Sequence, residues 1–213
     1  MTSGARQRKA TKPRARANVE VLLLAAGAST RMRGPDKLLE DINGDPLLRH
    51  CARVALGAKV ARVNVVLPPN HKPRLAALHG LNITTVDSPH WQDGISASIR
   101  AGLAATAPDC KAVIIALADM PEVTADHLDR LVAAFDPAEG REICRAISAD
   151  GTPGHPVLFG RRFFEALATL NGDRGARDVL QDAADFLINV PTKGQGASID
   201  LDTPEDWAKW RQA

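Results

Sequence analysis

Short runs of apolar, often β-branched residues alternate along this chain with longer stretches in which apolar positions recur at helical spacing. The runs that predict strands are Val19 to Leu24, Arg62 to Leu67, Ile83 to Val86, Ala112 to Leu117 and Ile143 to Ser148. The stretches that predict helices are Pro46 to Leu56, Pro73 to Leu78, Ile95 to Ala105, Ala125 to Phe135, Arg161 to Leu170 and Ala176 to Ala184. This alternation predicts an α/β sheet with right-handed crossovers, and the continuous apolar character of the strands predicts cover on both faces.

The pattern changes after Ser148. The segment DGTPGHPVLFG places turn-forming residues around one short apolar run, and TLNGDRGARD is a second polar segment that contains glycine. We expect both segments to be loops on the side of a pocket that receives a second substrate. Ligands of open parallel sheets lie beyond the carboxyl ends of the strands, so the chemistry is expected there.

Composition limits the classes of protein that this chain can belong to. With 213 residues and 45% hydrophobic content, we expect one domain over residues 19–213, and no apolar run approaches the roughly 20 residues of a membrane span. Three widely spaced cysteines without a metal-binding pattern indicate small core residues in a reducing, cytoplasmic setting. Six Lys and Arg residues and no acid occupy residues 1–18, which predicts a disordered basic tail rather than a secretory signal or a nucleic-acid site.

The loop after the first predicted strand combines glycines with cations. Gly27 and Gly34 allow backbone N–H groups to face inward, and Arg31, Arg33 and Lys37 add positive charge, which suits a polyphosphate. The spacing fits neither GxxxxGK followed by Ser or Thr nor GxGxxG, so neither a P-loop nor a dinucleotide fingerprint is present.

Two segments carry carboxylates that could hold a metal ion. Asp119 directly follows seven apolar residues, and Asp200 and Asp202 lie just before a predicted helix start. Such oxygen ligands suit Mg²⁺, which retains waters that substrate phosphates can replace. Asp202 also fits a structural role, because DTPED reads as a helix start with Thr203 as N-cap and Asp206 in a capping box.

Together these segments resemble a known family. LAAGASTRMRGPDKLL, WQDGISASIRAGL, ALADMP, GHPVLF with GDRGARDVL, and IDLDTPEDW are similar to motifs of nucleotidyltransferases in the branch of the molybdenum cofactor cytidylyltransferases and guanylyltransferases. The resemblance implies a Rossmann-like three-layer sandwich with a mostly parallel sheet, of the nucleotide-diphospho-sugar transferase type. Two departures are the extra Arg33 in RMRGPDK, and the lack of a basic residue before Gly-His-Pro.

The resemblance also implies roles for particular residues. Arg31, Lys37 and Asp119 are expected to be catalytic, and Asp119 with Asp200 to bind Mg²⁺, with Asp202 as the alternative second ligand. The residues expected to contact the nucleotide are Leu24, Ala25, Ala26, Gly27, Arg31, Lys37, Gly94, Ser96 and Ser98. The residues expected to contact the acceptor are Gly154, His155, Asp173 and Gly175.

The predicted reaction follows from these roles. Ala26, where guanine users have glycine, favours CTP as donor, since one methyl group changes discrimination by about 1–3 kcal/mol. We expect transfer of CMP from CTP to the terminal phosphate of molybdenum-molybdopterin, with a molybdoenzyme or its maturation chaperone as the recipient of the product. The alternatives are GTP as donor, a sugar or alcohol phosphate as acceptor, or a non-catalytic molybdopterin carrier.

Overall fold

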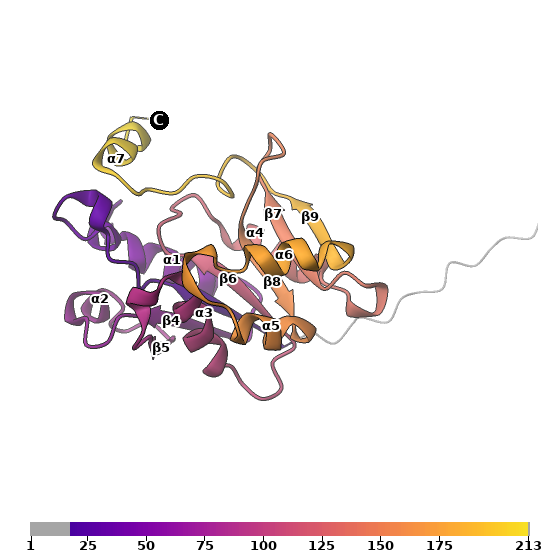
Figure 1. Cartoon of the computed structure of the whole chain (residues 1–213). Helices are drawn as coiled ribbons and strands as arrows, with labels where there is room; N and C mark the ends of the chain where they lie inside the picture. Colours follow the sequence, from indigo (N-terminus) through magenta and orange to yellow (C-terminus); the bar gives the residue numbers. More distant parts are fainter. Residues whose placement is uncertain (1–17, 213) are drawn as a thin grey trace, which may run out of the picture.

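The computed structural model describes residues 18–212, and these residues form one seven-stranded sheet and a two-stranded ribbon (Figure 1). The strands of the sheet are β1 Val19–Leu24, β4 Arg62–Leu67, β5 Thr84–Asp87, β6 Ala112–Leu117, β7 Ile143–Ile147, β8 Pro153–Gly160 and β9 Leu187–Pro191. The ribbon pairs β2 Asp41–Ile42 with β3 Asp45–Pro46. The predicted basic tail, residues 1–18, lies outside the described residues apart from Asn18, so the domain boundary stays a prediction.

The sheet is mostly parallel. Its order is β5-β4-β1-β6-β8-β7-β9, in which β8 is antiparallel to both of its neighbours and the remaining pairs are parallel. The helices are α1 Leu47–Gly57, α2 Lys72–Ala77, α3 Ile95–Ala104, α4 Ala125–Ala134, α5 Phe164–Ala168, α6 Arg177–Asp182 and α7 Pro204–Trp210. None of the helices within residues 18–212 is long and apolar enough to cross a bilayer.

Two apolar cores lie on opposite faces of the sheet. Successive residues of β1 alternate between them, as the two-residue period of a strand requires: Val21 and Leu23 face one core, and Leu22 and Leu24 the other. Side chains of α1 and α4 close the first core, and side chains of α3, α5 and α6 contribute to the second. The result is the predicted three-layer α/β arrangement. The three cysteines are buried and free, as expected for core residues.

Strand β8 corrects the prediction of a loop over DGTPGHPVLFG. Residues Val157 to Phe159 are almost fully buried, and β8 pairs with β6 on one side and β7 on the other. The two prolines and three glycines of the segment suggested turns, but the apolar run is long enough to form the centre of a buried strand. The segment therefore contributes a central strand, and the polar residues at the start of this strand lie at one end of the sheet.

The predicted helix from Arg161 to Leu170 is also shorter in the structure. A 3-10 turn, Arg161–Phe163, precedes α5, which ends at Ala168. The end of the chain forms α7, and the predicted capping box of Thr203 and Asp206 is confirmed, since each side chain accepts a hydrogen bond from the other residue's backbone N–H. In Figure 1, α7 lies at one end of the molecule, near the indigo segment that follows β1.

Candidate active site

The loop that follows β1, residues 25–40, is built from two 3-10 turns and is called the β1 loop below. The first turn, Thr30–Met32, lies between Ser29 and Arg33, and both of these residues have left-handed backbone, with φ of 54° and 59°. Met32 is buried, whereas Arg33 points outward and pairs with Glu205 of α7 at 2.9 Å. Arg33, the extra residue relative to the family motif, thus projects from the loop at a position with left-handed backbone.

The second turn positions the lysine of the loop. Asp36 is the N-cap of the turn Lys37–Leu39, and its side chain accepts a hydrogen bond from the N–H of Leu38 at 3.1 Å. Leu38 is buried in the core below, which anchors this turn to the sheet. The side chain of Lys37 therefore extends from a fixed turn toward the carboxyl edge of the sheet.

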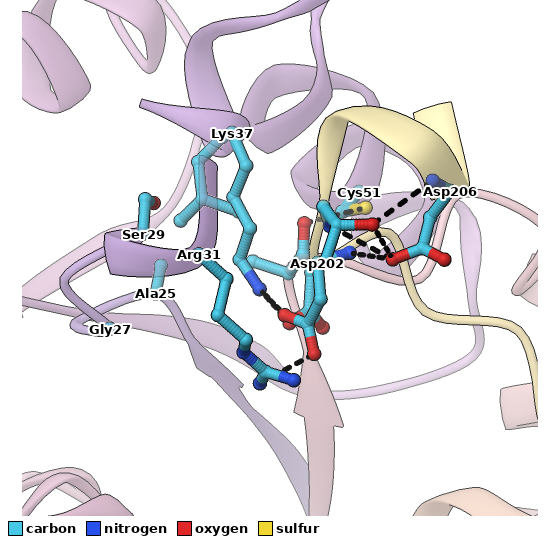
Figure 2. Close-up of polar contacts among 12 residues, drawn as sticks. Ala25, Gly27, Ser29, Arg31, Lys37, Cys51, Asp202 and Asp206 are labelled. Carbon is cyan, nitrogen blue, oxygen red and sulfur yellow. Dashed lines mark hydrogen bonds and ion pairs between the residues drawn. The ribbon is translucent and has the colours of Figure 1, made fainter. Parts of the chain in front are cut away.

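Cations of the β1 loop meet carboxylates from two other segments (Figure 2). The Nζ atom of Lys37 lies 2.5 Å from Oδ2 of Asp119 and 2.5 Å from Oδ1 of Asp202. A guanidinium nitrogen of Arg31 lies 2.6 Å from Oδ2 of Asp202. Residues separated by more than 160 positions in the chain thus meet in one polar cluster.

The carboxylates reach this cluster by different routes. Asp119 lies two residues beyond the end of β6, as the sequence indicates, but Asp200 and Asp202 lie in the irregular segment between β9 and α7 rather than at a strand end. The N–H of Leu201 donates to the carbonyl of Asp119 at 2.9 Å. This backbone bond fixes the second acidic segment beside the first.

The charges of the cluster perturb one another. Burial lowers the pKa of Lys37, but the carboxylates of Asp119 and Asp202 outweigh burial, so the pKa lies above its ordinary value. Burial and the negative charges of Asp202 and Asp119 raise the pKa of Asp200. The cluster therefore keeps Lys37 charged and disfavours a further negative charge at Asp200.

The cluster can accept a hard cation. The buried Oδ1 of Asp119 has no hydrogen-bond partner among the described residues, and Asp200 forms no ion pair with any of them. No group of three or more His, Cys, Asp or Glu side chains within residues 18–212 has the geometry of a complete metal site. Mg²⁺ is often bound by two carboxylates, with oxygen atoms of the substrate completing its coordination shell.

A cavity of about 470 Å³, the loop pocket, lies against this cluster. Its walls are formed by Leu24, Ala26, Gly27, Ala28, Arg31, Lys37, Trp91, Gln92, Gly94, Ile95, Ser98, Leu117, Asp119, Asp173, Asp200 and Asp202. Two residues that the resemblance implied for nucleotide contact lie elsewhere: the side chain of Ser96 is fully buried, and Ala25 is almost fully buried with its carbonyl bonded to Arg74. Trp91, to which the sequence motifs assigned no role, is part of the wall.

A second cavity of about 410 Å³, the strand pocket, lies over β6 and β8. It contains all four residues implied for acceptor contact, Gly154, His155, Asp173 and Gly175. Its walls also include Thr152, Arg174 and Arg177, to which no role was assigned from the sequence, although both arginines lie in the motif GDRGARDVL. The two pockets share four wall residues, namely Ile95, Leu117, Asp173 and Asp200.

Glycines permit close approaches at the junction of the pockets. A Cβ on Gly94, whose φ is 94°, would lie 2.1 Å from Oδ1 of Asp173, and a Cβ on Gly154 would lie 1.6 Å from the carbonyl oxygen of Ala197. The first contact sets Asp173 beside the N-terminus of α3, and the second holds β8 against the segment that leads to Asp200. Burial lowers the pKa of His155, which keeps its ring neutral at the floor of the strand pocket.

Comparison with known sequences gives a consistent relationship. Residues 21–186 match the family described as the MobA-like NTP transferase domain. The purine catabolism protein PucB of Bacillus subtilis (strain 168) is 28% identical over 206 residues, which cover 90% of this chain and 95% of that protein. A molybdenum cofactor guanylyltransferase of Bradyrhizobium sp. (strain ORS 278) is 36% identical over 141 residues, which cover 64% of this chain and 63% of that protein.

Solved structures agree with the sequence matches. Rv0371c from Mycobacterium tuberculosis H37Rv has a TM-score of 0.78 and 27% identity, over 93% of this chain and 100% of that one. The same protein in complex with manganese has a TM-score of 0.75 and 26% identity, over 92% of this chain and 100% of that one. These findings confirm the predicted fold class and the resemblance drawn from the sequence motifs.

Proposed function

Because the chain belongs to the MobA-like NTP transferase domain family, we propose that it transfers CMP from CTP to the terminal phosphate of molybdenum-molybdopterin and releases pyrophosphate. The observation that carries this proposal is the pair of pockets joined at Asp173 and Asp200, with Lys37, Arg31 and Asp119 beside their junction. A nucleotide in the loop pocket and a phosphorylated acceptor in the strand pocket would bring their phosphates together at that junction.

The reaction needs alignment more than it needs a base. An oxygen of the acceptor's phosphate attacks the α-phosphorus of CTP, the bond from that phosphorus to the bridging oxygen breaks, and pyrophosphate leaves with the bonding electrons. The attacking oxygen is already anionic, so no proton has to be removed. This supports an active site composed of cations and carboxylates, without a nucleophilic Ser or Cys.

Lys37 and Arg31 supply positive charge to the phosphates. Both side chains already contact the carboxylate of Asp202, so incoming phosphate oxygens compete with that carboxylate for the same donors. The exposed side chain of Arg31 can follow the leaving pyrophosphate, whereas Lys37, which is 11% exposed, acts from a fixed position. Charge neutralisation at such positions lowers the barrier where negative charge develops.

Asp119 and Asp200 would hold Mg²⁺, and Asp202 is the alternative to Asp200. The unpartnered Oδ1 of Asp119 and the lack of any ion pair to Asp200 within the described residues support the first pair, since Asp202 is already engaged by two cations. A bound Mg²⁺ supplies neutralisation of phosphate charge and orients the α-phosphate. A manganese complex of the Mycobacterium relative is consistent with a divalent ion in this family.

The choice of CTP rests on Ala26, which lines the loop pocket and whose methyl group would narrow the space beside the base. GTP is the alternative donor, because curated relatives at 26–36% identity are named molybdenum cofactor guanylyltransferase. A sugar or alcohol phosphate is the alternative acceptor.

Pyrophosphate release tests the donor and the acceptor together. We expect release with CTP, Mg²⁺ and molybdenum-loaded molybdopterin, and at least tenfold slower release with GTP, in line with weak discrimination by one methyl group. Faster release with GTP would reassign the donor. Binding of the pterin without release with either nucleotide would instead support a carrier.

The assigned role of Asp119 gives a second arm of the same experiment. Asp119→Ala should lower turnover by at least about 100-fold, while its circular dichroism spectrum remains that of the wild type. Asp182→Ala, an exposed acid outside both pockets, is the matched control and should retain normal turnover.

A further inference from the structure

Arg74 is a buried arginine that contacts the β1 loop at several points. It lies in α2 and is 2% exposed. Its guanidinium donates to the carbonyl oxygens of Ala25 at 2.7 Å and Gly27 at 2.8 Å. It also donates to both carboxylate oxygens of Asp36 at 2.8 Å, and one nitrogen lies 3.4 Å from the hydroxyl of Ser29. One side chain thus joins the beginning of the loop to its end.

The partner Asp36 extends this connection to the second turn. Its carboxylate accepts from the hydroxyl of Ser29 and from the N–H of Leu38, both at 3.1 Å. Burial raises the pKa of Asp36, but the hydrogen bonds and charge of Arg74 outweigh burial, so the pKa lies below its ordinary value. A buried ion pair adds little net stability, so the main effect of this pair is to fix the geometry of the loop through its hydrogen bonds.

The hydrogen bonds from Arg74 also determine which way the neighbouring N–H groups of the loop point. In a trans peptide the C=O of one residue and the N–H of the next point in opposite directions. The peptide bonds after Ala25 and Gly27 are trans, so carbonyls that face Arg74 turn the N–H groups of Ala26 and Ala28 away from it. Ala26 and Ala28 line the loop pocket, and Arg74 does not.

The two N–H groups are available to a ligand. Within residues 18–212, the N–H of Ala25 donates to the carbonyl of Val66 at 2.9 Å, but neither Ala26 nor Ala28 donates a backbone hydrogen bond. Ala26 is buried, and buried amide donors are normally satisfied, so its unused N–H beside the cavity indicates a donor reserved for a bound molecule. Ala28 is exposed, so its N–H is open to the same ligand.

We propose that Arg74 is a positioning residue, which fixes the carbonyls of Ala25 and Gly27 so that the N–H groups of Ala26 and Ala28 donate to the nucleoside triphosphate. This inference rests on the proposed function only in requiring that the loop pocket binds a nucleotide. The Arg74–Asp36 pair also sets the turn that begins at Lys37. Arg74 touches no substrate itself, so its effect is transmitted through the backbone of the β1 loop.

Nucleotide affinity tests the proposal without an acceptor. Isothermal titration with CTP or GTP and MgCl₂ should show binding about 10- to 100-fold weaker for Arg74→Met, the effect of misplacing two hydrogen-bond donors. Arg74→Lys keeps the charge but lacks the planar fork, so its affinity should fall between those of Arg74→Met and the wild type.

Arg49→Met is the matched control. Arg49 also donates to two carbonyl oxygens, those of Ala77 and His79, both at 2.9 Å, but it lies outside both pockets. This variant removes a comparable set of contacts at the other end of α2, and its affinity should stay within about twofold of the wild type. An equal loss of affinity in Arg49→Met and Arg74→Met would overturn the proposal, because general weakening of α2 would then explain both.

Amide resonances give a direct readout of the two donors, including the case in which Arg74→Met does not fold. In the wild type, nucleotide should move the ¹H–¹⁵N resonances of Ala26 and Ala28 downfield, and in Arg74→Lys these shifts should be reduced by half or more. Nucleotide binding that leaves both wild-type resonances in place, or identical shifts in Arg74→Lys, would overturn the inference while leaving the proposed function intact. A wild type that binds neither nucleotide would refute both.

Discussion

Lys37 is the residue that contacts carboxylates from both acidic segments of the site. Its ammonium group lies at equal distances of 2.5 Å from Asp119 and Asp202, which approach from segments 83 positions apart. Both carboxylates are largely buried, at 19% and 13% side-chain exposure, so they depend on this one cation and on Arg31 for compensation. Removal of a single partner from such a cluster leaves uncompensated buried charge.

Replacement of Lys37 should therefore affect stability as well as activity. We expect Lys37→Met to lower the free energy of unfolding at pH 7 by about 1–3 kcal/mol, because two partly buried acids lose their shared partner. Added MnCl₂ should restore part of this loss, since a divalent cation neutralises the same oxygens. Urea denaturation with and without the metal measures both effects.

Lys59→Met provides the comparison for this prediction. Lys59 pairs with Asp129 on the surface at 3.4 Å and is 63% exposed, so its loss should change stability by less than about 0.5 kcal/mol. If both lysine variants lost the same free energy of unfolding, the ion pairs of Lys37 would contribute no more to stability than an exposed surface pair does.

Position in the sequence indicated some of these residues and not others. Arg31, Lys37 and Asp119 could be selected because they lie in segments that follow predicted strands, where ligands of parallel sheets bind. Arg74 could not, because an arginine in a short helix usually faces solvent and nothing in its neighbours indicates that it is buried. The engagement of Asp202 by two cations was equally hidden, because its helix-capping context explained it without any tertiary contact.

At the scale of single elements, the start of α4 supports the acidic segment of the site. His127 is buried, its Nδ1 accepts from the N–H of Thr124 at 3.4 Å, and its Nε2 lies 3.1 Å from the carbonyl of Lys193. These bonds require a neutral ring with the proton on Nε2. Gly196 packs against the same ring, so the segment that leads to Asp200 rests on the cap of α4.

This arrangement predicts a pH dependence of stability. Burial lowers the pKa of His127, so the folded state binds this proton less readily than the unfolded state does. The contribution of the neutral ring is present above pH 6.5, the ordinary value, and is lost as the pH falls through the lowered pKa of the folded state. His127→Gln, whose amide can still cap Thr124, should reduce the loss of unfolding free energy between pH 7.5 and 5.5 by about 1 kcal/mol.

Urea denaturation at the two pH values measures this difference. His79→Gln, which changes an exposed histidine, is the control and should reproduce the wild-type dependence. A dependence in His127→Gln equal to that of the wild type would assign the loss of stability to other groups.

The elements themselves were predictable where local pattern and burial agree. The strands β1, β4 and β6 are mainly apolar and lie inside the sheet, and their bounds were predicted from the sequence to the residue. Strand β8 was not, because its prolines and glycines resemble a turn and only pairing with β6 and β7 makes it a strand. Strand β9 was missed for a similar reason, since an edge strand with partly exposed residues has a weak pattern.

At the scale of the whole molecule, the two pockets are not independent. Ile95, Leu117, Asp173 and Asp200 belong to both, so a molecule in one pocket touches walls that a molecule in the other also touches. Asp173 and Asp200 are the exposed members of this shared wall, and Asp173 lies against the backbone of Gly94 at the start of α3.

A substitution in the shared wall should therefore affect both substrates. We expect Asp173→Ala to raise KM for the nucleotide and for the acceptor, each by about tenfold, the effect of one lost charged hydrogen bond. Ser98→Ala, which lies in the loop pocket alone, should raise KM for the nucleotide only. Steady-state kinetics with each substrate varied in turn would contradict a shared wall if Asp173→Ala changed one constant and not the other.

The ammonium group of Lys37 between two acids also bears on how the protein is made. Because the chain provides its own counter-charge at Lys37, neutralising these two acids during folding requires no divalent ion.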